Sequence, residues 1–146
     1  MTLEEKINGE IKTAMLAKNA GRLEALRAIK SLIIILKTSS EGFSDDAANK
    51  AMMKEVKKRK ETAEIYTTQN RPELAAVELS QAAVIEEFLP KQLSEEEVTV
   101  ELKKIIESLG AKSIADLGKV MGAANKAMAG RADGKMISEL VKKLLS

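Results

Sequence analysis

Apolar residues recur at intervals of three and four along most of this chain, the spacing that places side chains on one face of an α-helix. Tyr66, Phe43 and Phe88 are its only aromatic residues. The core therefore has to be built from small aliphatic side chains, which suit closely packed helices better than a β-sandwich. We expect an all-α protein. The clearest apolar stripe consists of Leu23, Leu26, Ile29, Leu32, Ile33 and Leu36.

Local signals mark where the helices begin and end. Ser94 and Glu97 have the spacing of a capping box. Gly110 follows an amphipathic stretch and can take the left-handed conformation that ends a helix. These signals predict short helices joined by tight turns. The other expected helix starts are Thr2, Ser44, Pro72, Ser113 and Asp133.

The chain changes character at Pro90, which ends one helical stretch shortly before the capping box starts the next. We expect two domains, an N-terminal helical domain over residues 1–90 and a three-helix domain over residues 91–146. The first would contain the cationic stretch KEVKKRK at 54–60. Its simplest interpretation is a solvated helix face whose lysine stems cover apolar neighbours.

The chain contains no cysteine and no histidine. Thiolate chemistry, sulfur-ligated metals and the commonest general base are thereby excluded. We expect a protein that is not an enzyme and that holds no metal or cofactor. The longest purely apolar run covers residues 32–36, far short of the roughly 20 residues that a membrane span needs. Without a signal-like apolar segment near the start, the expected location is the cytoplasm.

Four glycines and four cationic residues fall within residues 118–135, in the more basic C-terminal part of a chain whose net charge is only +2. Gly118 and Gly122 would share one helix face, which implies close approach by a neighbouring helix or by a ligand such as the RNA backbone. Lys119 and Lys126, seven residues apart, could extend a phosphate site.

The turn GRADG, residues 130–134, carries its own phosphate signal. Gly130 can take a positive φ, and Asp133 can cap the last helix. The N-terminus of that helix would then present N–H groups beside Arg131 and Lys135, an arrangement that can hold a phosphate.

The chain resembles the YqeY-like proteins, which share their C-terminal module with the tail domain of GatB, the tRNA-contacting subunit of the bacterial tRNA-dependent amidotransferase. The resemblance implies a helical N-terminal domain followed by a three-helix domain. The matching motifs are RLEALRAIKSLI (22–33), KEVKKRKETAEIY (54–66), RPELAA (71–76), EEFLPKQLSEEE (86–97), DLGKVMG (116–122) and GRADGK (130–135).

Because the tail of GatB is not catalytic, the resemblance implies a non-catalytic accessory protein that binds tRNA or another structured RNA, alone or together with an aminoacyl-tRNA-processing enzyme. The alternative is a helical protein-interaction module, and a part in glutamine-dependent aminoacyl-tRNA amidation, a carbon–nitrogen ligase reaction, is less favoured. No membrane partner is expected. Carried over position by position, the RNA-contacting residues are Gly118, Lys119, Gly122, Gly130, Arg131, Gly134 and Lys135. Lys126 lies outside the matching motifs and is added because it shares a helix face with Lys119.

Overall fold

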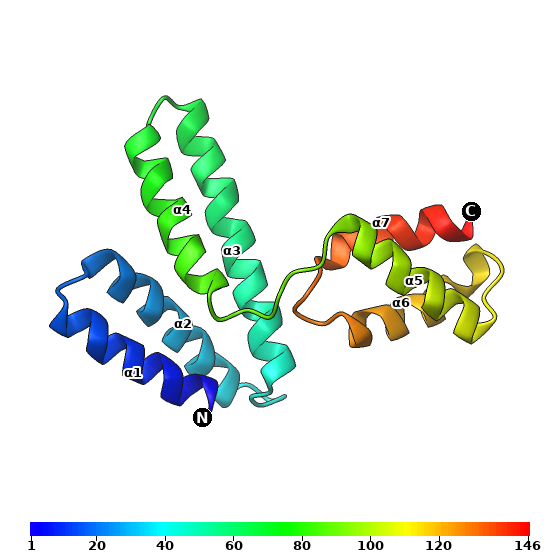
Figure 1. Ribbon diagram of the computed structural model, residues 1–146, viewed down its shortest axis with the longest axis horizontal. Coiled ribbons are helices and arrows are strands. Elements are labelled where there is room, and N and C mark those ends of the chain that lie inside the picture. The colour runs from blue at the N-terminus through cyan, green and yellow to red at the C-terminus, as the bar shows by residue number, and fades with distance from the viewer. The chain divides into compact units, whose positions relative to one another are not determined.

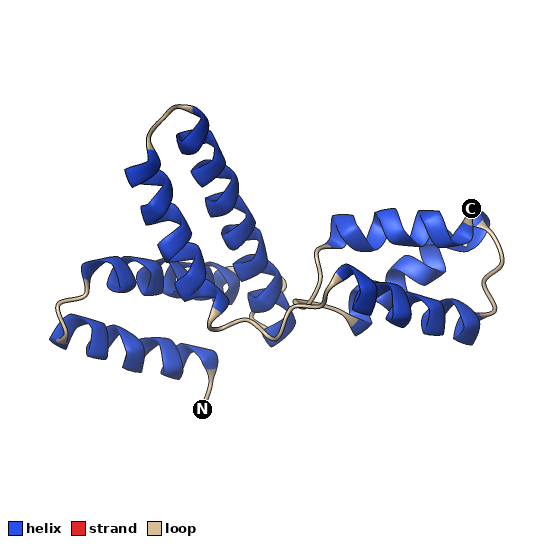
Figure 2. Cartoon of the chain, turned by 45° about the horizontal axis from the view of Figure 1, so that its top comes forward, coloured by secondary structure: helices blue, strands red, loops and turns tan.

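The computed structural model describes residues 1–146 and confirms the all-α prediction, since every regular element is helical and no strand is present (Figure 2). Seven α-helices and one short 3₁₀ helix follow one another along the chain. They are α1 (Leu3–Leu16), α2 (Ala20–Thr38), α3 (Asp45–Thr68), α4 (Pro72–Glu86), α5 (Glu95–Leu109), η1 (Ile114–Asp116), α6 (Leu117–Ala127) and α7 (Gly134–Leu145).

The helices gather into two compact units, Met1–Leu89 with α1 to α4 and Pro90–Ser146 with α5 to α7. Each unit has a hydrophobic core of its own. That residues 1–90 and 91–146 fold as two independent domains remains a prediction.

Two antiparallel helix pairs, α1 with α2 and α3 with α4, form the N-terminal unit (Figure 1). Its core is aliphatic, as the scarcity of aromatic residues predicts, and α2 contributes three of its nine buried members. Val77 of α4 lies outside this core and is 51% exposed. The buried members are Ile7, Ala14, Leu26, Ile29, Ile33, Met52, Val56, Ala82 and Ile85.

One polar side chain, Gln81 on α4, is buried in this unit and is 5% exposed. Its amide oxygen accepts a hydrogen bond from Arg59 on α3, and its amide nitrogen donates to Glu24 on α2 (3.1 Å). Arg59 also pairs with Glu55 (3.1 Å) and Glu78 (3.6 Å). The network joins three helices and leaves no buried side-chain polar atom unsatisfied.

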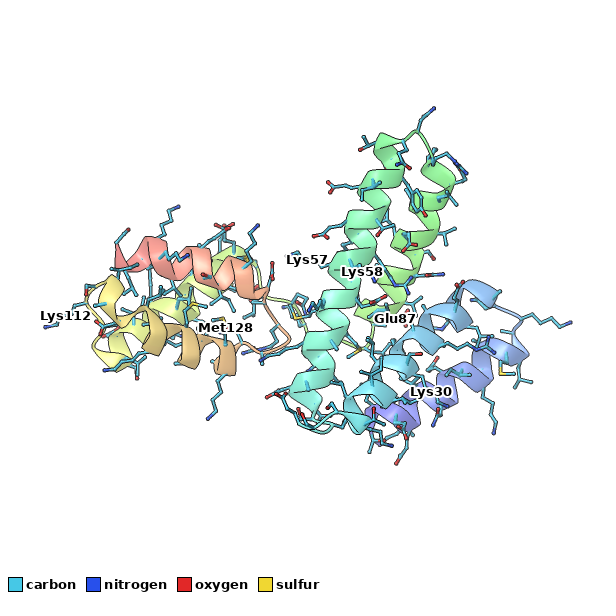
Figure 3. All side chains as sticks on the ribbon, turned by 180° about the vertical axis from the view of Figure 1, so that it is seen from behind. Lys30, Lys57, Lys58, Glu87, Lys112 and Met128 are labelled. Carbon is cyan, nitrogen blue, oxygen red and sulfur yellow. The ribbon has the colours of Figure 1, made fainter.

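The C-terminal unit packs α5, α6 and α7 around a core without aromatic residues (Figure 1). Met128, at the end of α6, is fully buried in this core (Figure 3). The buried members are Val98, Leu102, Val120, Ala124, Met128, Ala132, Ile137, Leu140, Val141 and Leu145.

The helix ends follow the local sequence signals except at the start of α6. Ser94 and Glu97 form the predicted capping box, and Gly110 takes the predicted left-handed conformation with φ 64°. The expected cap by Ser113 is wrong, because its side chain makes no capping hydrogen bond. Instead, the Asp116 carboxylate accepts from the Lys112 N–H (3.0 Å), and a 3₁₀ turn precedes α6.

Opposite effects are expected from alanine at two glycines of the C-terminal unit. Gly110→Ala should lower the free energy of unfolding by about 1 kcal/mol, because alanine is strained at positive φ. Gly122→Ala should raise it by about 0.5–1 kcal/mol, because Gly122 lies within α6 and an added Cβ would meet no atom within 4 Å. Urea unfolding followed by circular dichroism measures both. If both substitutions changed the free energy of unfolding in the same direction, the different roles assigned to Gly110 and Gly122 would be wrong.

The capping box should make stability depend on pH. Hydrogen bonds from the Ser94 N–H and hydroxyl lower the pKa of the Glu97 carboxyl. A pKa lowered by folding stabilises the protein above the unfolded-state pKa, and this contribution is lost as pH falls through the folded-state value. Glu97→Ala should therefore be less stable than wild type at pH 7, with the difference shrinking below about pH 4.

Urea unfolding at a series of pH values measures this difference. The control is Glu96→Ala, which removes an exposed carboxylate from the same first helical turn without breaking the capping box. If both variants showed the same pH dependence of unfolding, the contribution would come from the helix dipole alone.

Candidate nucleic-acid interface

Gly118 and Gly122 lie four residues apart on the exposed side of α6. A Cβ built at either position would meet no atom within 4 Å. Glycine within a helix costs about 0.5–1 kcal/mol relative to alanine. Within the C-terminal unit no other helix packs on these glycines, so packing inside this unit, one of the two explanations for them, is not observed. The face stays open to a ligand or a partner.

Lys119 and Lys126 lie to one side of this open face. Both are exposed, and their separation by seven positions corresponds to about 10 Å along the α6 axis. The face combines small residues, where a ligand can approach the helix backbone, with a cation toward each end. Such a surface suits a chain of negative charges.

Asp116 lies at the N-terminal end of this face. The Lys112 N–H donates to its carboxylate, and this bond is the main cause of its lowered pKa, followed by the Ser113 N–H and the charge of Lys119. Through this hydrogen bond the carboxylate stabilises the turn that leads into α6.

Gly130 has the predicted positive φ, 76°, and it is buried. Its carbonyl oxygen accepts from the Gln92 side-chain amide (2.7 Å), and the Arg131 carbonyl accepts from the Leu93 N–H (2.7 Å). These two bonds hold the GRADG turn against the segment that enters α5. The structure thus gives Gly130 a role in closing the unit.

The Arg131 guanidinium donates through Nη2 to the Ala127 carbonyl (2.7 Å). Its charge therefore lies at the C-terminal end of α6, where the helix dipole is negative. A guanidinium has five N–H donors, so this bond leaves others for a ligand.

Asp133 caps α7 as predicted, and its carboxylate accepts from the Lys135 N–H (3.3 Å). Gly134 is the first residue of α7, and both Gly134 and Lys135 are exposed. Lys126, Arg131 and Lys135 therefore cluster where α6 ends and α7 begins. Gly118 and Lys119 lie toward the other end of α6.

Sequence reasoning missed the hydrogen bonds of Gln92 and Leu93. Both lie in the stretch PKQL, where the only signal noticed was the proline that ends the preceding helical stretch. No local pattern shows that these residues contact a turn almost forty positions later.

Neither membrane spanning nor metal binding is suggested by the side chains of this chain. No group of three or more acidic, histidine or cysteine side chains could hold a metal ion. None of the helices combines the length and apolar character needed to cross a bilayer. The exposed cations and the N-terminus of α7 can bind anions.

Comparison with known proteins gives a family and no individual relative. No curated protein matches the chain. The family described as Yqey-like protein matches residues 4–145, which is nearly the whole chain. The chain therefore belongs to the YqeY-like protein family.

Proposed function

We propose that this protein is a non-catalytic accessory protein that binds tRNA or another structured RNA through its C-terminal unit. The observation that carries the proposal is the open glycine face of α6. Gly118 and Gly122 weaken the helix, no other helix of the C-terminal unit packs on them, and two lysines lie beside them. Close approach of a sugar-phosphate backbone explains all three features.

Binding of this kind would recognise phosphates and RNA shape. Residues 90–146 contain no aromatic side chain on which a base could stack. Folded RNA is recognised largely through its shape, its phosphates and its 2′-hydroxyls. The expected binding is therefore sensitive to salt and has little sequence preference. It would serve to hold an RNA in the cytoplasm, alone or for an aminoacyl-tRNA-processing enzyme.

The alternative is a protein-interaction module, and the same open face favours it. Two glycines one helical turn apart allow the backbone of a partner helix to approach closely. The two functions differ in what remains bound at high salt, because phosphate contacts weaken as salt rises and packed helices do not. Glutamine-dependent amidation by this chain remains the least favoured function.

The first test removes the lysines of the proposed site in the full-length protein. The variant Lys119→Gln/Lys126→Gln/Lys135→Gln should bind total bacterial tRNA at least tenfold more weakly than wild type near 0.1 M salt. The slope of log affinity against log salt should become shallower by about 2, because each phosphate contact contributes about 0.7–0.9. Fluorescence titration across a salt series measures both quantities.

The matched control is Lys103→Gln/Lys142→Gln/Lys143→Gln. It removes three exposed lysines from the same unit but away from the end where α6 meets α7. Arg131 is left unchanged because its guanidinium caps α6. If both triple variants lost the same affinity, binding would reflect overall charge, and the proposed site would be wrong.

A second test uses the stability of α6. Gly122→Ala should weaken tRNA binding about fivefold, equivalent to about 1 kcal/mol, although it stabilises the helix. This combination arises because the added methyl group fills space that the ligand uses. Gly9→Ala serves as the control, because Gly9 also lies within a helix with no atom near its missing Cβ. Unchanged RNA affinity in Gly122→Ala, together with loss of a nuclease-resistant protein partner, would favour the interaction module.

A further inference from the structure

The cationic stretch at residues 54–60 separates into groups with different surroundings. Arg59 points inward, where it pairs with Glu55 and Glu78 and donates to Gln81. Lys60 pairs with Glu86 on α4 (3.0 Å). These two cations belong to the packing of α3 against α4.

The remaining cations lie on the outer side of α3. Lys54 and Lys58 are exposed, and Lys50 precedes them by one helical turn. Residues spaced by four lie on one helix face. Lys57 and Lys58 lie near the middle of the helix (Figure 3). We define Lys50, Lys54 and Lys58 as the α3 stripe.

The α3 stripe has no structural partner within the N-terminal unit. None of its three lysines forms an ion pair, although neighbouring Arg59 and Lys60 both do. The only carboxylate within this stretch of the helix, that of Glu55, is bound to Arg59. The stripe therefore presents three positive charges over about 12 Å of helix, and it ends where Glu61 follows.

The neighbours of the stripe indicate the chemistry of its ligand. Ala47, Ala51 and the half-buried Met53 are the apolar residues beside it, so it lacks the exposed bulky apolar side chains with which a basic helix enters a membrane surface. It also lacks an aromatic residue for base stacking. A row of phosphates fits this surface, because a nucleic-acid strand carries one phosphate per about 3.4 Å of its axis.

We propose that the α3 stripe is a second contact for the RNA backbone, and that the N-terminal unit binds the same RNA as the C-terminal unit. This inference rests on the proposed function. Two weak phosphate sites on one chain reinforce each other, because binding at one raises the effective concentration of RNA at the other. A chain with a net charge of only +2 can in this way bind a polyanion through two local surfaces.

The test compares full-length variants in tRNA titrations across a salt series. Lys50→Gln/Lys54→Gln/Lys58→Gln should lower the affinity about tenfold near 0.1 M salt and reduce the salt slope by about 2. The control is Lys6→Gln/Lys12→Gln/Lys18→Gln, which removes three exposed lysines of the same unit at or near α1. It should change the affinity less than twofold. Circular dichroism should show unchanged helix content in both.

The outcomes separate this inference from the function on which it rests. Equal affinities of the stripe variant and its control would overturn the inference and leave the C-terminal site standing. Loss of binding in the stripe variant, with none in Lys119→Gln/Lys126→Gln/Lys135→Gln, would support the stripe and overturn the C-terminal site. Absence of tRNA binding by wild type at low salt would overturn both. Loss of a nuclease-resistant protein complex by the stripe variant alone would assign the stripe to an acidic protein.

Discussion

The C-terminal unit depends on the backbone of Gly130, which turns the chain between α6 and α7 with φ 76°. Because φ is positive there, most side chains would be strained at this position. The Gly130 carbonyl and that of Arg131 accept hydrogen bonds from Gln92 and Leu93, so the turn also fixes the segment that enters α5. The surface of the proposed RNA site is thus positioned by bonds that lie beneath it.

The glycines of residues 118–135 therefore have different roles in the structure. Gly130 serves the fold, since its positive φ favours glycine over other residues. Gly118 and Gly122 have no such requirement, and alanine would stabilise the helix that contains them. A loss of stability without a structural reason is expected where a surface serves binding. Gly118 and Gly122 are therefore the glycines that bear on function.

Sequence reasoning succeeded where the determining contacts are local. The all-α class, the cap of α5 by Ser94 and Glu97, and the left-handed Gly110 follow from residues a few positions apart. It failed where contacts join distant segments, as with the Arg59–Gln81 hydrogen bond, which decides which cations of α3 point inward. Which residues touch RNA is still a prediction.

The scarcity of aromatic residues has a consequence for observing this protein, because it contains no tryptophan and its single tyrosine reports poorly on two separate cores. Oxidation of methionine can report on each core instead. Met52 is buried in one unit and Met128 in the other, whereas Met1 and Met15 are exposed. Oxidation to the sulfoxide requires access to sulfur, so the rates at the buried positions, relative to the exposed ones, report how often each unit opens. Met52 and Met128 are therefore chemical probes of the opening of their own cores.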